Sequence, residues 1–141
     1  MILSLREQLV RDEGGYQAFV YNDSVGIPTI GIGRNVSHTG PGLTIYEMDL
    51  MLNTDISKFT IEVLKALPWS GALDAVRLEV LVNMSFNLGT LGLLKFVKFL
   101  SALQKGDHAT AAKEMLDSTW AKQVGPRATR LSQQMILGVR Q

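Results

Sequence analysis

The stretch that decides the fold begins with Asp12-Glu13-Gly14-Gly15-Tyr16 and continues through Tyr21-Asn22-Asp23 to Pro28-Thr29-Ile30-Gly31-Ile32-Gly33. It places one acid at the end of a predicted helix, a second acid in the turn of a predicted hairpin, and a threonine on the returning strand. Two carboxyl groups in different surroundings suit the cleavage of a glycosidic bond, because one must donate a proton while the other assists water or the sugar cation. These two acids and the threonine are therefore the first candidates for chemistry.

The two acids differ in their predicted surroundings. Residues 2–13 predict an amphipathic helix with apolar residues at positions 2, 5 and 9, and Gly14-Gly15 predicts its end. Glu13 would lie in the last turn, where the helix dipole disfavours a carboxylate and raises its pKa unless a cation lies near it. Asp23, in a polar turn, has a reason to stay ionised. The residues alone leave an alternative open: a solvated charge at a helix end and an ordinary turn-forming aspartate.

A β-hairpin is predicted directly after this helix. Residues 17–21 predict a strand, residues 22–26 a turn and residues 27–33 a second strand. Pro28 would confine the second strand to an edge, because proline has no N–H to offer a neighbouring strand. Period-two alternation puts Thr29 on the face opposite Ile30 and Ile32. Threonine is also a common strand residue, so its position alone does not require a catalytic role.

The rest of the chain is predicted to be mainly helical. Thr44-Ile45-Tyr46-Glu47 has the pattern of a capping box, and apolar residues then recur at three- and four-residue steps as far as Pro68. This pattern predicts one helix over 45–66, which at ~1.5 Å per residue spans about 30 Å and can connect two lobes. Loop is predicted at 35–43, and further helices over 71–88, 93–104, Asp107 to Leu116 and Pro126 onward, with a short turn around Trp120.

Composition limits the classes of function that the chain can have. The 141 residues suffice for one domain with a buried core, and 46% of them are hydrophobic. The chain has no cysteine, which excludes disulfides, thiolate catalysis and zinc–thiolate sites. His38 and His108 stand apart, without ligand partners at metal spacing. We therefore expect neither a metal nor an organic cofactor.

Charge and hydropathy bear on possible partners. The net charge is +1 and the basic residues are dispersed, so no nucleic-acid partner is expected. The most apolar later run, Leu91 to Leu100, is interrupted by Lys95 and Lys98 and is too short to span a bilayer. The first residues lack the basic start, apolar run and cleavage site of a signal peptide. We therefore expect a protein that is not inserted in a membrane and that first stays in the cytoplasm.

Several motifs together carry a resemblance to a known family. They are Glu13-Gly14, Tyr21-Asn22-Asp23 and Thr29-Ile30-Gly31-Ile32-Gly33, followed by Leu73-Asp74-Ala75-Val76-Arg77, Asn83-Met84, Phe86-Asn87-Leu88-Gly89, Trp120 and Pro126-Arg127-Ala128. This combination resembles the T-even phage lysozymes, the endolysins of glycoside hydrolase family 24. The resemblance covers nearly the whole chain, and the combination is specific although each piece is common.

The resemblance implies an α+β, mainly helical, lysozyme-like fold. A small β-hairpin lobe, about residues 14–44, and a larger helical lobe, about residues 1–13 and 66–141, would be joined by the long helix at about 45–66. The active-site cleft would lie between the lobes. The whole chain, residues 1–141, would form a single lysozyme domain.

The resemblance also implies roles for six residues. Glu13 would be the general acid, and Asp23 with Thr29 would position the attacking water or stabilise the cationic sugar. The residues implied in binding or positioning the substrate are Arg127, Phe86 and Asn87. These three also have structural interpretations: a solvated arginine at a helix start, a core phenylalanine and an asparagine at a helix end.

Two departures from the family pattern limit what is carried over. The interval between Glu13 and Asp23 is one residue longer than the commonest form, and Gly14-Gly15 is where we expect the extra residue to be absorbed. Arg34 stands where the family usually has histidine, so the ion pair of that histidine is not carried over. The loop after Arg34 is also short, so the saccharide contacts of this lobe are not transferred.

The implied activity is hydrolysis of the β-1,4 bond between N-acetylmuramic acid and N-acetylglucosamine in peptidoglycan. A monomeric endolysin would remain in the host cytoplasm until a holin opens the membrane, then act on the wall in the periplasm and lyse the host. An enzyme carried on the virion is a variant of this interpretation. The rivals are a lytic transglycosylase, a catalytically inactive peptidoglycan-binding module, and a small helical protein that binds nucleic acid or another protein.

Overall fold

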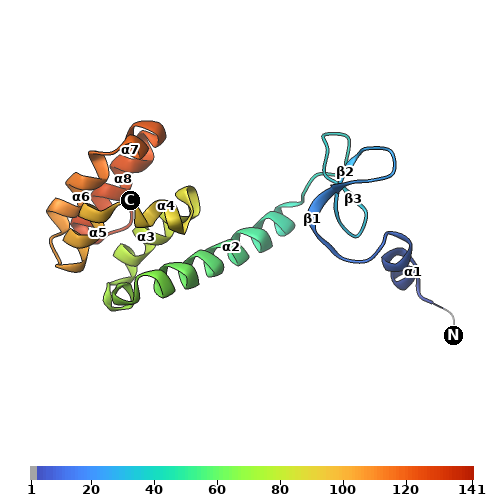
Figure 1. The fold of residues 1–141 in the computed structure, drawn as a ribbon, viewed down its shortest axis with the longest axis horizontal. Coiled ribbons are helices and arrows are strands. Elements are labelled where there is room, and N and C mark those ends of the chain that lie inside the picture. Colours follow the sequence, from blue (N-terminus) through green and yellow to red (C-terminus); the bar gives the residue numbers. More distant parts are fainter. Residues whose placement is uncertain (1–2) are drawn as a thin grey trace. The chain divides into compact units, whose positions relative to one another are not determined.

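The computed structural model describes residues 3–141 and is mainly helical, with one small antiparallel sheet of three strands (Figure 1). The predicted α+β, mainly helical class is confirmed. The chain forms two compact units, unit 1 (Met1–Asp49) and unit 2 (Leu50–Gln141). Ile2, the first residue of the predicted apolar stripe, lies outside the described residues. The single-domain organisation and the assignment of residues 1–13 to a helical lobe stay predictions.

Unit 1 begins with helix α1 (Leu5–Asp12). The Glu7 N–H donates to the Ser4 hydroxyl, and the Ser4 N–H donates to the Glu7 carboxylate at 2.7 Å. This reciprocal capping box satisfies donors that the first turn would leave unpaired. It starts the helix at residue 5, later than predicted. The predicted end at Gly14 is confirmed, since that glycine takes the left-handed conformation with φ of 79°.

The sheet of unit 1 has the strand order β1-β2-β3, and both neighbouring pairs are antiparallel. The strands are β1 (Gln17–Asn22), β2 (Pro28–Gly31) and β3 (Arg34–Asn35). In the hairpin of the first two strands, Asn22 pairs with Pro28. The predicted hairpin is therefore confirmed.

Two details of the predicted second strand are wrong. The strand does not continue to residue 33, because Gly31 and Gly33 adopt left-handed φ values of 67° and 65° and turn the chain back into β3. As a result β2 lies between two neighbours and is not the edge strand. Pro28 is compatible with this central place because it is the first residue of its strand.

The long helix α2 (Ile45–Ala66) has the predicted bounds and the predicted capping box. Thr44 N–H donates to the Glu47 carboxylate at 2.8 Å, and Glu47 N–H donates to the Thr44 hydroxyl at 3.1 Å. Arg34 adds an ion pair to the same carboxylate at 2.8 Å. The hydrogen bond from the Thr44 backbone, together with the Thr44 hydroxyl and the Arg34 charge, lowers the pKa of Glu47 below its ordinary value. These contacts join β3 to the first turn of α2.

Besides residues 50–66 of α2, unit 2 consists of shorter helices, which differ from the sequence prediction at three places. The predicted short turn around Trp120 is a helix, α7 (Thr119–Val124). The helix predicted over 71–88 begins later, because Asp74 accepts from the Arg77 N–H as an N-cap. The helix predicted over 93–104 is divided, because Phe96, with φ of −80° and ψ of 60°, leaves the helical conformation. The elements are η1 (Pro68–Ala72), α3 (Ala75–Leu88), α4 (Thr90–Leu94), α5 (Val97–Gln104), α6 (His108–Leu116), α7 (Thr119–Val124) and α8 (Pro126–Leu137).

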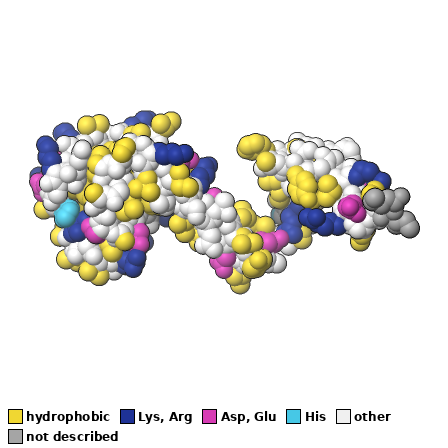
Figure 2. Space-filling model, turned by 90° about the horizontal axis from the view of Figure 1, so that it is seen from below, with side chains coloured by type: hydrophobic (Ala, Val, Ile, Leu, Met, Phe, Trp, Pro, Cys, Tyr) yellow, Lys and Arg dark blue, Asp and Glu magenta, His cyan; other side chains and the backbone are white. Residues whose placement is uncertain are grey.

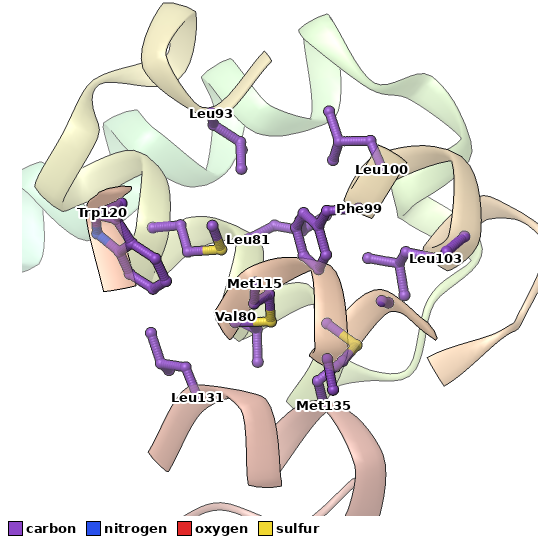
Figure 3. Close-up of a cluster of buried hydrophobic side chains, with 14 of the residues drawn as sticks. Val80, Leu81, Leu93, Phe99, Leu100, Leu103, Met115, Trp120, Leu131 and Met135 are labelled. Atoms are coloured by element: carbon purple, nitrogen blue, oxygen red, sulfur yellow. The ribbon is translucent and has the colours of Figure 1, made fainter. Parts of the chain in front are cut away.

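An apolar cluster forms the core of unit 2. Leu81 of α3, Phe99 of α5 and Met115 of α6 lie in the centre of this cluster in Figure 3 and are almost completely buried. Trp120 of α7 is also buried, and its ring packs edge-on against Phe96 with the centroids 6.0 Å apart. Removal of these side chains from water is the main stabilising contribution of unit 2.

Replacement of Leu81 by alanine tests this core. Leu81 is 0% exposed, so Leu81→Ala removes buried methyl groups and leaves a cavity. We expect a loss of about 2–5 kcal/mol in the free energy of unfolding, measured by urea denaturation. Leu91→Ala is the matched control, because Leu91 is 79% exposed and should change the free energy by no more than about 0.5 kcal/mol. Equal losses in the two variants would contradict this description of the core.

The capping carboxylate of α2 predicts a pH-dependent contribution to stability. Because folding lowers the pKa of Glu47, its contribution is present above the pKa of the unfolded chain, about 4.3, and is lost as the pH falls through the folded value. Glu47→Gln should therefore lower Tm near pH 7 and have a smaller effect near about pH 3. Asp49→Asn, which removes another carboxylate of the same helix without touching the capping box, should not show this pH dependence.

Candidate active site

Glu13 is the C-cap residue of α1, and the chain fixes its backbone on both sides. The Glu13 N–H donates to Leu9 O at 2.9 Å. The two glycines that follow close the helix end: Gly14 N–H donates to Arg11 O, and Gly15 N–H donates to Val10 O at 2.7 Å. This is the Schellman arrangement. It leaves the Glu13 side chain exposed at the end of the helix.

Asp23 closes the turn between β1 and β2 with its side chain. Its Oδ1 accepts hydrogen bonds from the Val25 N–H at 2.9 Å and from the Ile27 N–H at 2.8 Å. Its own N–H donates to Ile27 O, and its carbonyl accepts from the Gly26 N–H, both at 3.0 Å. One carboxylate oxygen is therefore used in holding the turn. The other oxygen, Oδ2, makes no hydrogen bond within unit 1 among the described residues.

Thr29 lies in β2, the central strand, two residues after Ile27. It is 3% exposed, and its hydroxyl donates to Ile27 O at 2.9 Å. The hydroxyl proton is thereby used, so the oxygen of Thr29 can only accept from a further partner. Asp23 and Thr29 are thus connected through the backbone of one residue, Ile27, since the first accepts from its N–H and the second donates to its carbonyl oxygen.

The Glu13 carboxyl lies against the turn that leads from β2 to β3. A Cβ atom placed on Gly33 would be 2.8 Å from Glu13 Cγ and would overlap the carboxyl group itself. The next residue, Arg34, donates to Gly42 O at 2.9 Å in addition to its ion pair with Glu47. An ion pair does therefore form at the position where histidine is usual in the family. Unit 1 alone carries all three predicted catalytic residues.

In unit 2, the structure brings Phe86 and Arg127 to one groove. The groove has a volume of about 570 Å³ and a mainly apolar lining from α2, α3 and the first turn of α8. Phe86 is partly exposed there and packs edge-on against Phe59 with the ring centroids 5.5 Å apart. Arg127 is half-buried and lines the same groove. The predicted placement of these two residues at a binding surface stays a prediction.

The side chain of Asn87 is hydrogen-bonded to the buried Trp120. Its side-chain Oδ1 accepts a hydrogen bond from Trp120 Nε1 at 2.8 Å. Because the indole N–H is a donor only, this bond fixes which end of the amide faces Trp120 and leaves the NH₂ group of Asn87 as the donor toward other partners. Residue spacing does not indicate this pairing, because the two residues are 33 positions apart.

The charged side chains and potential metal ligands of the described residues do not indicate a second functional site. On the face of unit 2 drawn in Figure 2, lysine and arginine side chains form separate groups with neutral and hydrophobic side chains between them. Within residues 3–141, no group of three or more His, Asp and Glu side chains is placed to hold a metal ion. No helix in the same range has both the length and the apolar character needed to cross a bilayer. The predicted absence of a nucleic-acid partner stays a prediction.

Comparison with known proteins identifies the class. A model of the phage lysozyme family, "Phage lysozyme", matches residues 11–134, which include every predicted site residue. The chain therefore belongs to the phage lysozyme family, and it is an enzyme of the lysozyme class. This confirms the family that the sequence motifs resembled.

The chain is also similar to three individual proteins. The chain is 29% identical, over 96% of its length, to the "Pre-baseplate central spike protein Gp5" of Enterobacteria phage T4, and spans 28% of that protein. It is 29% and 28% identical to "Probable T4-type lysozyme 1" and "Probable T4-type lysozyme 2" of Dictyostelium discoideum. Both of these alignments cover 93% of this chain and 92% of the relative.

Two substitutions of Asp23 separate the contribution of its hydrogen bonds to stability from the contribution of its charge. Asp23→Asn keeps an oxygen that can accept from the Val25 and Ile27 N–H groups, so the free energy of unfolding should change little. Asp23→Ala leaves these donors without their partner and should lower the free energy of unfolding by about 1–3 kcal/mol, measured by urea denaturation. If the alanine variant were as stable as the asparagine variant, the turn would not depend on this side chain.

Proposed function

We propose that the chain hydrolyses the β-1,4 bond between N-acetylmuramic acid and N-acetylglucosamine in peptidoglycan, with Glu13 as the general acid. Hydrolysis of this bond needs a group that protonates the leaving oxygen and a group on the other face of the sugar ring that directs water or stabilises positive charge. Glu13 is a carboxyl at a closed helix end, accessible to a polymer. No metal or organic cofactor enters this proposal.

The single observation that carries the proposal is the connection of Asp23 and Thr29 through Ile27. Asp23 Oδ2 and the Thr29 oxygen are both free to act as acceptors. Asp23 Oδ1 already accepts from two N–H groups, and the Thr29 hydroxyl already donates its hydrogen bond to Ile27 O. A water that donates one hydrogen to each acceptor points its oxygen lone pairs away from Asp23 and Thr29. Such a water is oriented as a nucleophile, which favours the inverting course over the retaining one.

Residues of unit 2 are proposed to hold the glycan strand. The ring of Phe86 and the guanidinium of Arg127 share a groove, which suits a substrate with apolar ring faces and charged peptide or lactyl groups. The NH₂ group of Asn87, oriented by Trp120, is a donor suited to the carbonyl oxygen of an N-acetyl group. These three residues would fix the register of the strand and take no proton themselves.

We further propose that the physiological role is lysis of the bacterial host by a monomeric endolysin. In this role the protein would remain in the host cytoplasm until a holin opens the membrane, and would then reach the wall in the periplasm. The similarity to the T4 central spike protein over 96% of this chain favours a second candidate role, a lysozyme carried on the virion. Mass spectrometry of purified particles distinguishes the two roles, because only the second requires the chain in the particle.

The experiment that tests the activity uses isolated peptidoglycan sacculi. The wild type should clear a suspension of sacculi and release fragments with reducing N-acetylmuramic acid ends, identified by mass spectrometry. Glu13→Gln keeps the size of the side chain and removes the proton donor, so activity should fall by about 10²–10⁴-fold. Asp23→Asn should also be strongly impaired while remaining folded. Asp12→Asn, the neighbouring acid on α1, is the matched control and should stay active.

Each other outcome contradicts a named part of the proposal. Anhydro ends would indicate a lytic transglycosylase. Equal clearing by the wild type and Glu13→Gln would exclude Glu13 as the acid. If no variant cleared the suspension while all of them bound sacculi, the chain would be an inactive binding module.

A further inference from the structure

We propose that Gly33 is a positioning residue for Glu13: its missing side chain leaves the space in which the carboxyl group lies. This inference rests on the proposed function, because it concerns the residue proposed as the acid. It adds a residue that does not touch the substrate and that the sequence predicted only as the last residue of a strand. Any side chain at position 33 should move the acid and leave the fold in place.

The argument begins with the space above Gly33. A Cβ atom built on this residue meets three atoms of Glu13: Cγ at 2.8 Å, Cδ at 2.5 Å, and Oε2 closer still. Real Cβ atoms essentially never approach other heavy atoms this closely, so either the turn or the Glu13 side chain would have to move. All three of the nearest atoms belong to Glu13.

The turn is held more firmly than the side chain. Gly33 follows β2 and precedes β3, where Ile30 and Arg34 face each other across the pair of strands. Arg34 is itself tied to Glu47 at 2.8 Å and to Gly42 O at 2.9 Å. The Glu13 side chain, in contrast, is exposed and has three rotatable bonds. A methyl group at position 33 would therefore displace the Glu13 carboxyl, which rotates at little cost.

The chain contains a matched control two residues away. Gly31 has φ of 67°, almost the same as the 65° of Gly33, but a Cβ atom on it meets nothing within 4 Å. Alanine at either position therefore suffers the same backbone strain, since both take a left-handed conformation that L-residues adopt at a cost. Only alanine at position 33 also collides with Glu13. A comparison of the two variants isolates the collision.

The experiment compares Gly33→Ala with Gly31→Ala in the full chain. We expect similar Tm values for the two variants. Hydrolysis of sacculi should fall about 100-fold in Gly33→Ala, as expected for an acid displaced by about 1 Å, and only a few-fold in Gly31→Ala. The position of the acid is read directly by NMR on protein with ¹³C-labelled glutamate, where the Glu13 carboxyl signal is assigned by its loss in Glu13→Gln. That signal should move in Gly33→Ala and stay unchanged in Gly31→Ala.

Several results would overturn the inference. It fails if the two alanine variants lose activity equally, or if Gly33→Ala loses activity while the Glu13 signal is unmoved. Should Gly33→Ala not fold, the double variant Glu13→Ala/Gly33→Ala decides: it folds if the collision was the cause, and failure to fold would mean that the backbone alone requires glycine. Failure of the proposed function is a separate result, namely an active Glu13→Gln, and the NMR comparison remains informative in that case.

Discussion

The turn of unit 1 that carries Asp23 depends on the backbone of one residue, Ile27. Its N–H is bound by the Asp23 carboxylate and its carbonyl oxygen accepts from the Thr29 hydroxyl and from the Asp23 N–H. Unit 1 has little apolar core of its own, and Thr29 is its one almost completely buried residue among those described. Directional hydrogen bonds therefore do much of the positioning that packing does elsewhere. They set the direction of both acceptors at once, so the turn and the proposed water site are one arrangement.

The second acid is positioned in a different way. Glu13 is the last residue before a Schellman ending, so its Cα is fixed by backbone hydrogen bonds, while its side chain finds its place only because Gly33 has no Cβ. A helix end and a turn that are separate in sequence thus meet at a single carboxyl. Positive φ values at Gly14 and Gly33 are required at both places, for a cap in one case and for a close approach in the other.

Unit 2 is stabilised mainly by its buried apolar cluster. Its buried cluster orients Trp120, and Trp120 in turn orients the amide of Asn87 at the end of α3. A buried tryptophan must satisfy its N–H, and here the partner is the exposed asparagine next to Phe86. The core therefore determines which hydrogen-bonding group an exposed side chain offers.

Local patterns in the sequence determined the end of α1, the hairpin, the bounds of α2 and the family, because capping boxes, glycine stops and 3.6-residue periodicity act within a few residues. They did not determine that the chain turns back at Gly31 to form β3, because residue spacing does not reveal the left-handed backbone of Gly31 and Gly33. They also did not reveal that the helix is divided at Phe96, whose ring packs against the distant Trp120. The tertiary structure alone decided that Asp23 and Thr29 both bind the backbone of Ile27, that Gly33 lies beneath Glu13, and that Asn87 binds Trp120. Each of these contacts depends on side-chain distances and directions, which residue spacing does not specify.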